Sequence, residues 1–257
     1  MTQVLILGGT TEASALAGAL EADDRFAPTL SLAGVTRAPH RPAIPLRIGG
    51  FGGADGLRRW LLGNRIEALV DATHPFAQRI SRNAVLAAAQ AGVRLLRIAR
   101  PPWQPVAGDR WTMVADMRGA AEALGAAPLR VLLTIGRKDL APFTEFPQHD
   151  YIVRSVDAPP PELLPQRCTV LTMRGPFTLD HERALLDEHA VDTLVTKNSG
   201  GPATAPKLAA ARERGLRVVM IARPEPDAGT AACVADWQDV LSWLERIHQD
   251  AATLRAV

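Results

Sequence analysis

The pattern of hydrophobic positions predicts short buried strands that alternate with helices. Short apolar runs end at glycine or polar residues, and the apolar residues between these runs recur at helical spacing, as in Ala13, Leu16, Ala17 and Leu20. The pattern predicts strands over residues 4–7, 29–33, 46–48, 68–70 and 93–98, with helices over 13–20, 57–61 and 80–90. This alternation is typical of a parallel sheet covered on both faces.

A proline-rich segment, PPWQPVAGDR over residues 101–110, interrupts the alternation and is interpreted as a linker. The alternation then resumes, with strands predicted over 131–134, 151–156, 169–173, 193–196 and 217–221 and helices over 179–188, 205–214 and 237–247. The sequence therefore predicts an α/β protein with two Rossmann-like domains, residues 1–105 and 106–257, each with a parallel sheet covered by helices.

Two stretches of similar length repeat one order of elements. Residues 70–101 run from VDATHPF through NAVLAAAQAG to VRLLRIARP, and residues 195–224 run from VTKNSGG through PKLAAARERG to LRVVMIARP. Any alanine-rich helix before a strand with basic flanks would look alike. We nevertheless interpret the two stretches as one strand–helix–strand unit used twice.

Composition narrows the classes of protein. The 257 residues are 47% hydrophobic and 22% charged, as in ordinary globular proteins. The net charge is +2 and the basic residues are scattered, so we expect no nucleic-acid partner. Cys168 and Cys233 lack metal-ligand spacing, and MTQVLIL has neither a basic leader nor a long apolar segment. We expect a cytoplasmic protein without metal or membrane partner. A monomer is compatible with the sequence, which leaves the oligomeric state open.

The residues after the first strand are candidates for phosphate binding, because ligands of parallel sheets bind beyond the carboxyl ends of the strands. Residues 8–13 read GGTTEA, with two adjacent glycines instead of the spaced glycines of the full dinucleotide fingerprint. A plain tight turn is the alternative. The position directly after an N-terminal strand favours nucleotide binding.

The region of the second strand indicates which nucleotide the protein binds. An acidic residue usually holds the ribose hydroxyls of NAD, but residues 29–53 contain no Asp or Glu. Thr36 and Arg37 stand there instead. A guanidinium suits a 2′-phosphate by charge and bidentate geometry, so the sequence favours NADPH over NADH. A solvated loop arginine is the alternative.

The segment DATHPFA after the fourth strand gathers polar side chains. A proline in the first turn of a helix would place Thr73 or His74 near the N-cap, and a cap alone could explain Thr73. Asp, Thr and His within four residues exceed what a cap requires. Thr73 is therefore a candidate cofactor contact and His74 a candidate catalytic residue.

Cationic residues collect in the loops that follow the strands of the second half. The chain has three lysines, and two of them, Lys138 and Lys197, lie in such loops. With Arg137 and Arg174 they would form a cationic wall suited to a substrate with several carboxylates, with solvated surface charge as the alternative. Further candidate substrate contacts in the TKNSGG loop are Ser199 and Gly200.

The motifs of several enzyme classes are absent from the sequence. Ser155 follows the sole tyrosine, Tyr151, where a short-chain dehydrogenase needs lysine, and HExxH, G-x-S-x-G and GK[ST] do not occur. The simplest interpretation is reduction of a large anionic substrate by NADPH. A non-catalytic NADPH sensor and an NADPH reductase of a smaller carbonyl compound stay open.

Together, GGTTEA, DATHPFA, LLTIGRKDL and TKNSGG resemble the precorrin-6A reductase family of cobalamin biosynthesis, over nearly the whole chain. The resemblance implies two Rossmann-like domains with the active cleft between them, and NADPH-dependent reduction of a double bond in a macrocyclic tetrapyrrole with acetate and propionate side chains.

The resemblance also implies residue roles. Gly8, Gly9, Thr10 and Thr11 would meet the cofactor phosphates, Arg37 the 2′-phosphate, residues 71–77 the nicotinamide region, and the second-domain Arg and Lys residues the substrate carboxylates. A proton must accompany the hydride, and His74 and Lys197 are the candidate donors. Water or a substrate carboxylate could serve instead.

Overall fold

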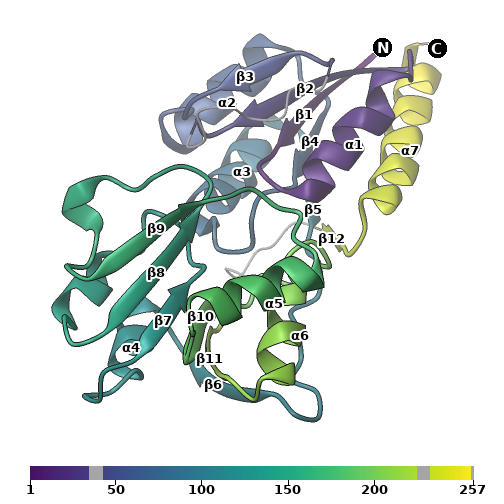
Figure 1. Cartoon of the computed structure of the whole chain (residues 1–257). Helices are drawn as coiled ribbons and strands as arrows, with labels where there is room; N and C mark the ends of the chain where they lie inside the picture. The colour runs from purple at the N-terminus through teal and green to yellow at the C-terminus, as the bar shows by residue number, and fades with distance from the viewer. Residues whose placement is uncertain (35–42, 225–231, 256–257) are drawn as a thin grey trace. The chain divides into compact units, whose positions relative to one another are not determined.

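The computed structural model describes residues 1–34, 43–224 and 232–255. The chain forms two compact units, one made of residues 1–101 with the C-terminal strand and helix, the other of Pro102–Pro224. Each unit contains a six-stranded sheet with helices on both faces (Figure 1). The predicted α/β class with two parallel sheets is confirmed. Among the described residues, no helix combines the length and apolar character needed to cross a bilayer.

The first sheet is parallel throughout and has the strand order β12-β5-β4-β1-β2-β3. Its strands are β1 (Thr2–Leu7), β2 (Phe26–Leu32), β3 (Leu46–Ile48), β4 (Ala68–Asp71), β5 (Arg94–Ile98) and β12 (Ala232–Val234). The order is that of the doubly wound dinucleotide-binding fold, in which the order of the strands across the sheet reverses between β1 and β4.

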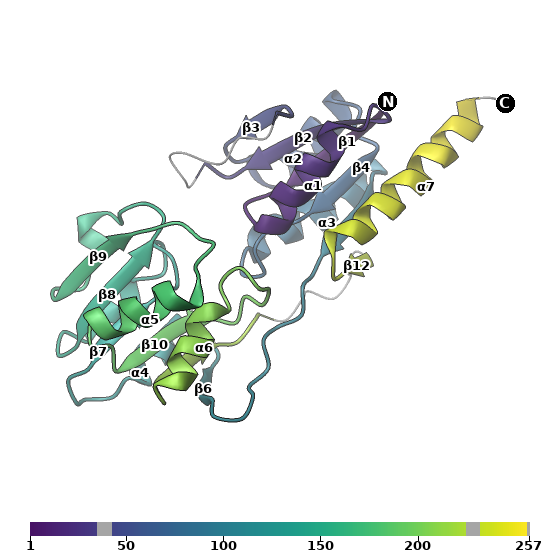
Figure 2. The same cartoon turned by 45° about the vertical axis from the view of Figure 1, so that its right-hand side comes forward.

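β1 is buried on both faces of this sheet, which explains its unbroken apolar sequence. Val4 and Ile6 pack with the helices α1 (Thr11–Glu21) and α7 (Trp237–Arg255). Leu5 and Leu7 pack on the other face with α2 (Gly53–Gly63) and α3 (Gln78–Ala91). Figure 2 shows α1 and α7 along one face of the sheet.

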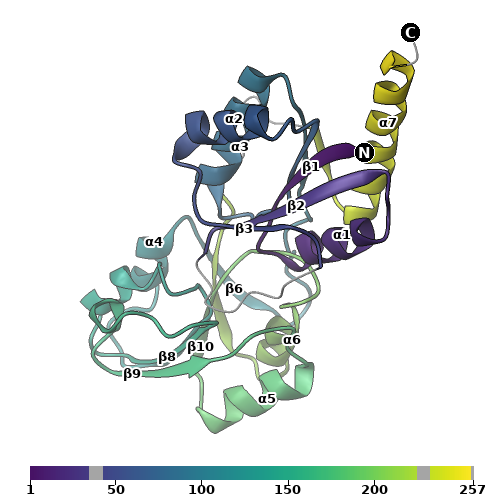
Figure 3. The same ribbon diagram turned by 90° about the horizontal axis from the view of Figure 1, so that it is seen from above.

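The second sheet is also parallel, with the order β6-β11-β10-β7-β8-β9. Its strands are β6 (Arg110–Val114), β7 (Arg130–Leu133), β8 (Asp150–Ser155), β9 (Cys168–Thr172), β10 (Thr193–Lys197) and β11 (Arg217–Ile221). One face carries α5 (Leu179–Glu188) and α6 (Pro206–Glu213), the other α4 (Met117–Glu122) and the 3₁₀ helix η1 (Ala141–Glu145) (Figure 3). A second 3₁₀ turn, η2 (Pro161–Leu163), precedes β9.

The sixth strand of each sheet follows the fifth strand of the other sheet in the sequence. β6 comes after β5 but pairs with β11, and β12 comes after β11 but pairs with β5. The triplet Val-Ala-Asp ends both exchanged strands, at residues 114–116 and 234–236, and leads into α4 and α7. The repeated unit therefore extends beyond the strand–helix–strand stretches visible in the sequence.

Most predicted helices and strands are found with shifts of a few residues at their ends, but α7 continues to Arg255 instead of ending at residue 247, and β6, β12 and α4 were not predicted. β6 and β12 lie at sheet edges and are only partly buried, so their sequences lack a continuous apolar run. The predicted extent of the second domain, to residue 257, is wrong. Val240, Leu244 and Ile247 of α7 share a core with Val4 of the first sheet. The amphipathic pattern of a helix does not specify which of the two sheets that helix packs against.

His149 is expected to make stability depend on pH. Burial lowers the pKa of its imidazole below the ordinary 6.5, and the carbonyl of Gly125 offsets this only in part. Below about pH 6.5 the unfolded chain binds a proton that the folded chain excludes, so stability present above that pH is lost as pH falls. We expect the unfolding free energy to fall by up to about 1.4 kcal/mol per pH unit there.

Chemical denaturation between pH 7 and pH 5 measures this slope. His149→Leu should flatten it, whereas the exposed His181→Gln should not. Equal slopes in wild type and His149→Leu would contradict the assignment.

Candidate active site

The turn at residues 8–10 joins β1 to α1 at the carboxyl edge of the first sheet. The Gly8 N–H donates to the Ser31 carbonyl at 2.9 Å, and a Cβ at Gly8 would lie 2.6 Å from the Leu30 side chain. Gly9 has φ of +115°, and nothing lies within 4 Å of a Cβ built there. Gly8 is thus needed for packing, while Gly9 presents an open backbone face that a phosphate can approach closely.

Thr10 connects this turn to the end of β4. Its Oγ1 accepts a hydrogen bond from the Ala13 N–H at 3.2 Å, which caps α1, and donates to the Ala72 carbonyl at 2.7 Å. The hydroxyl is therefore used within the protein, at the point where the strand order reverses. Among the described residues, the Thr11 N–H at the start of α1 has no hydrogen-bond partner and is left for an anion.

Glu12 lies in that first turn and carries charge of the wrong sign for a phosphate site. Arg100 Nη1 lies 2.7 Å and 2.8 Å from the two Glu12 carboxylate oxygens, and both side chains are mostly buried. Burial raises the pKa of Glu12, but its hydrogen bonds from Arg100 and from backbone outweigh burial and lower it overall. Arg100 therefore keeps Glu12 ionised and balances its charge.

A small pocket opens beside this ion pair. Its lining comes from the α1 turn, the ends of β4 and β5 and the residues just after them, namely Thr10, Glu12, Ala72, Thr73, Pro75, Ile98 and Arg100. Sequence reasoning missed Arg100. The signal was its place directly after the fifth strand, in the triplet Ala-Arg-Pro that recurs at residues 222–224.

Asp71 organises the segment after β4. The buried carboxylate accepts hydrogen bonds at Oδ1 from the Thr73 N–H at 3.1 Å and from the Thr73 hydroxyl at 2.6 Å. Its Oδ2 lies 3.6 Å from Arg97 Nε on the neighbouring β5. Asp71 thus fixes Thr73, whose Oγ1 is also 3.3 Å from Ser81 Oγ on α3.

His74 lies in a turn instead of at a helix cap. The Ala77 N–H donates to the His74 carbonyl at 2.7 Å, and the Phe76 N–H donates to His74 Nδ1 at 3.3 Å. The helix α3 begins only at Gln78, after Ala77, so the predicted N-cap role of Thr73 or His74 is wrong. Asp71 holds Thr73 in a local turn that delays the helix. Because Nδ1 accepts a hydrogen bond, we assign the ring proton to Nε2.

The candidate 2′-phosphate ligand, Arg37, lies outside the described residues. Arg47 is the described arginine nearest to Arg37 in the sequence. It donates to the Gly50 carbonyl at 2.8 Å and to the Gly49 carbonyl, and its guanidinium stacks 3.7 Å from the centre of the Phe51 ring. Arg47 is thus occupied in holding its own loop.

Lys197 ends β10 at the carboxyl edge of the second sheet. Its Nζ donates to Asp139 Oδ2 at 2.5 Å, and the side chain is 14% exposed. Asp139 belongs to the loop after β7, and β7 and β10 are the neighbouring strands between which this sheet reverses its order. The ion pair holds Lys197 at the reversal point and balances its charge.

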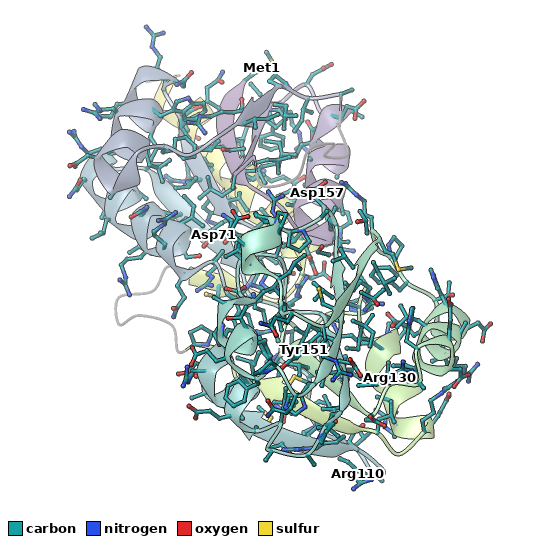
Figure 4. The ribbon with its side chains drawn as sticks, turned by 60° about the vertical axis from the view of Figure 1, so that its left-hand side comes forward. Met1, Asp71, Arg110, Arg130, Tyr151 and Asp157 are labelled. Atoms are coloured by element: carbon teal, nitrogen blue, oxygen red, sulfur yellow. The ribbon has the colours of Figure 1, made fainter. Side chains whose placement is uncertain are left out.

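The other predicted cations lie in loops at the same carboxyl edge of the second sheet. Lys138 and Arg174 are exposed, and neither forms a hydrogen bond or ion pair with another described residue. Arg137 is half-buried beside Lys138 in the loop after β7, and Arg174 follows β9, two strands away. In Figure 4, Asp157 marks this edge after β8, and Arg130 marks the opposite edge at the start of β7.

The 198–201 loop, residues Asn198 to Gly201, follows Lys197. Asn198, Ser199 and Gly200 are buried, and Gly200 and Gly201 have φ of +65° and +79°. The loop carbonyls accept hydrogen bonds from Arg223 and Trp103, neither of which the sequence identified. Trp103 stood in the proline-rich linker, which offered no signal.

No group of three or more His, Cys, Asp or Glu side chains that could hold a metal ion occurs in the described part of the chain. The carboxylates of Glu12, Asp71 and Asp139, at the two sheet edges, each lie beside an arginine or a lysine. The exposed cations Lys138 and Arg174 lie at the edge of the second sheet. These groups suit anionic ligands.

Comparison with known proteins identifies the family. Residues 3–245 match the family described as Precorrin-6x reductase CbiJ/CobK. The chain is 47% identical over 245 residues to a precorrin-6A reductase of Sinorhizobium sp, covering 94% of each, and 45% identical over 244 residues to that of Rhodococcus erythropolis, covering 95% and 98%. A solved structure of CobK precorrin-6A reductase superposes with a TM-score of 0.91 at 45% identity, covering 96% and 97% of the two chains. The chain therefore belongs to the precorrin-6x reductase family.

Proposed function

We propose that this chain catalyses the NADPH-dependent reduction of precorrin-6A to precorrin-6B in cobalamin biosynthesis. Membership of the precorrin-6x reductase family supports the reaction. The observation that carries the cofactor site is the open backbone face of Gly9, at the reversal point between β1 and β4.

The first sheet supplies the cofactor site. The backbone of Gly8, Gly9, Thr10 and Thr11 would hold the pyrophosphate, with Arg37 on the 2′-phosphate. Because Arg100 balances Glu12, the first turn of α1 keeps its attraction for anions. Thr73 borders the same pocket. NADPH, when bound, supplies the hydride.

The second sheet supplies the substrate site. Lys138 and Arg174 present uncompensated charge at its carboxyl edge, and Arg137 adds a third cation. Gly200 adds a backbone N–H from the 198–201 loop, whereas the Ser199 N–H and hydroxyl both donate to the Lys197 carbonyl, at 2.7 Å and 3.4 Å. Such a set suits the acetate and propionate groups of a tetrapyrrole, since guanidinium and ammonium groups bind carboxylates by charge-assisted hydrogen bonds.

Of the two candidate proton donors, Lys197 has the stronger support. Asp139 holds its ammonium group in place at the carboxyl edge of the second sheet, with a donor distance of 2.5 Å. His74 Nδ1 already accepts a hydrogen bond from the Phe76 N–H. A proton on Nδ1 would point at this N–H, so two hydrogen-bond donors would face each other. We therefore assign the protonating role to Lys197, with His74 Nε2–H as a hydrogen-bond donor.

A titration of the protein with NADPH and with NADH, followed by nicotinamide fluorescence, tests the cofactor. We expect wild type to prefer NADPH, and Arg37→Ala to weaken NADPH binding about 10- to 100-fold while leaving NADH binding unchanged, because a charge-assisted contact to the 2′-phosphate is lost. Arg59 is an exposed arginine on α2, so Arg59→Ala is a control that removes the same charge away from the proposed cofactor site.

Turnover completes this test. Addition of precorrin-6A should consume one NADPH per substrate molecule. Binding of NADPH without consumption would identify a sensor, and binding of neither nucleotide would rule out the proposed cofactor site.

A further inference from the structure

The segments that begin and end the second unit hold the same loop. Trp103 lies at the start of this unit and Arg223 at its end. Both donate hydrogen bonds to carbonyl groups of the 198–201 loop. The loop is thus fixed from two sides by residues distant from it in sequence.

Trp103 contacts the loop through its backbone and its indole. The Trp103 N–H donates to Asn198 Oδ1 at 2.8 Å, and Asn198 Nδ2 donates to the Trp103 carbonyl at 3.0 Å. The indole Nε1–H donates to the Gly201 carbonyl at 3.0 Å. Lys207, a buried residue of α6, places Nζ 5.1 Å from the centre of the Trp103 ring. These contacts fix the indole and, through it, the end of the loop.

Arg223 determines the direction of the next peptide N–H. Its Nε donates to the Asn198 carbonyl at 2.9 Å and its Nη2 to the Ser199 carbonyl at 2.8 Å. In a planar trans peptide the C=O and the following N–H point in opposite directions. With the Ser199 carbonyl held by Arg223, the Gly200 N–H is therefore directed away from the guanidinium.

The Gly200 N–H has the properties of a ligand donor. Gly200 is buried, and within the described ranges of the chain no residue accepts a hydrogen bond from its N–H. A buried N–H without a partner costs free energy unless a ligand or water satisfies it. Its left-handed φ of +65° is one that other residues adopt only with strain.

We propose that the Gly200 N–H binds a carboxylate of the substrate, and that Trp103 and Arg223 are positioning residues that aim it. This inference rests on the proposed function, in which the second sheet binds a polycarboxylate. It adds the backbone atom that contacts the carboxylate and the two side chains that act through the loop without touching substrate.

Steady-state kinetics with Trp103→Phe and Arg223→Lys test the proposal. Phenylalanine keeps a ring against Lys207 but has no indole N–H, and lysine keeps the charge but cannot span two carbonyls. We expect each variant to raise KM for precorrin-6A about 3- to 10-fold, the worth of one hydrogen bond, with kcat and the Kd for NADPH unchanged. A purely structural role would lower the melting temperature without this selective rise in KM.

Matched controls come from the same unit. The indole N–H of Trp111 on β6 is buried with no hydrogen-bond partner among the described residues, so Trp111→Phe removes an equal group without a loop contact. Arg217 on β11 donates to the Ala123 carbonyl at 2.7 Å, and Arg217→Lys matches the change at Arg223. Both controls should keep the wild-type KM.

Lys138→Gln separates this inference from the proposed function. If Lys138→Gln raises KM while Trp103→Phe and Arg223→Lys do not, the positioning role is refuted. The proposal that the carboxyl edge of the second sheet binds the substrate is then still supported. If none of the three variants raises KM, the substrate does not bind at the carboxyl edge of the second sheet, and the positioning role is refuted as well. A fall in kcat at unchanged KM in the two loop variants would also refute the proposal.

Discussion

Lys197→Met is expected to lower kcat for precorrin-6A reduction by roughly 10²–10⁴-fold, the range that a positioned proton donor contributes. Methionine keeps most of the length of the side chain but carries no proton. Asp139, left without its partner, is 36% exposed and can be solvated, so the variant should fold. Single-turnover kinetics with NADPH bound in advance would separate the chemical step from binding, and the Kd for NADPH should not change.

The control for this variant is Lys138→Met, which removes the same charge from the same sheet edge. Lys138 is exposed and has no assigned proton-transfer role, so we expect a rise in KM with little change in kcat. His74→Phe tests the second candidate donor. Wild-type turnover across pH in both Lys197→Met and His74→Phe would show that the proton comes from water or from a substrate carboxylate.

Glu182→Ala is expected to destabilise the second unit by about 3–5 kcal/mol, the usual cost of leaving one partner of a buried ion pair alone. Arg154 Nη1 on β8 donates to the two Glu182 oxygens at 3.0 Å and 2.9 Å, and the two side chains are only 5% and 0% exposed. The guanidinium also lies 4.2 Å from the centre of the Phe177 ring. Removal of Glu182 leaves this charge buried, and hydrogen exchange of the β8 amides would measure the loss.

Two further variants check the cause. Glu213→Ala removes the partner of Arg183 in an exposed pair, which should change the stability far less because solvent screens the two charges. Arg154→Met combined with Glu182→Leu removes both charges and should recover most of the stability, because apolar residues of similar volume replace buried pairs well. If the double variant is as unstable as Glu182→Ala, packing and not the unpaired charge is responsible.

The sequence alone was sufficient for the α/β class with two parallel sheets and for the family. β1 reads VLIL because both of its faces are buried, and α1 shows apolar residues on one side because the other side faces solvent. These are local consequences of burial, so periodicity reveals them. The same holds for the loops after the strands, since every parallel strand delivers its carboxyl end to one edge of the sheet.

Partnerships between distant residues were not visible in the sequence. Thr10 with Ala72, Glu12 with Arg100, and Lys197 with Asp139 each join loops that only the strand order makes neighbours. For this reason Lys197 was expected to be one cation of a wall and is instead charge-balanced. Trp103, in a proline-rich stretch without periodicity, gave no sign of its contact with the 198–201 loop.

The sequence by itself determined the α/β class, the positions of most helices and strands, and the candidate loops, because these depend on which residues are buried and on short-range geometry. Only the tertiary structure decided which sheet each sixth strand joins, that α7 covers the first sheet, and which charges are neutralised. An edge strand or an amphipathic helix carries the same local pattern whichever sheet it meets. Its partner is selected by the packing and pairing of the whole chain.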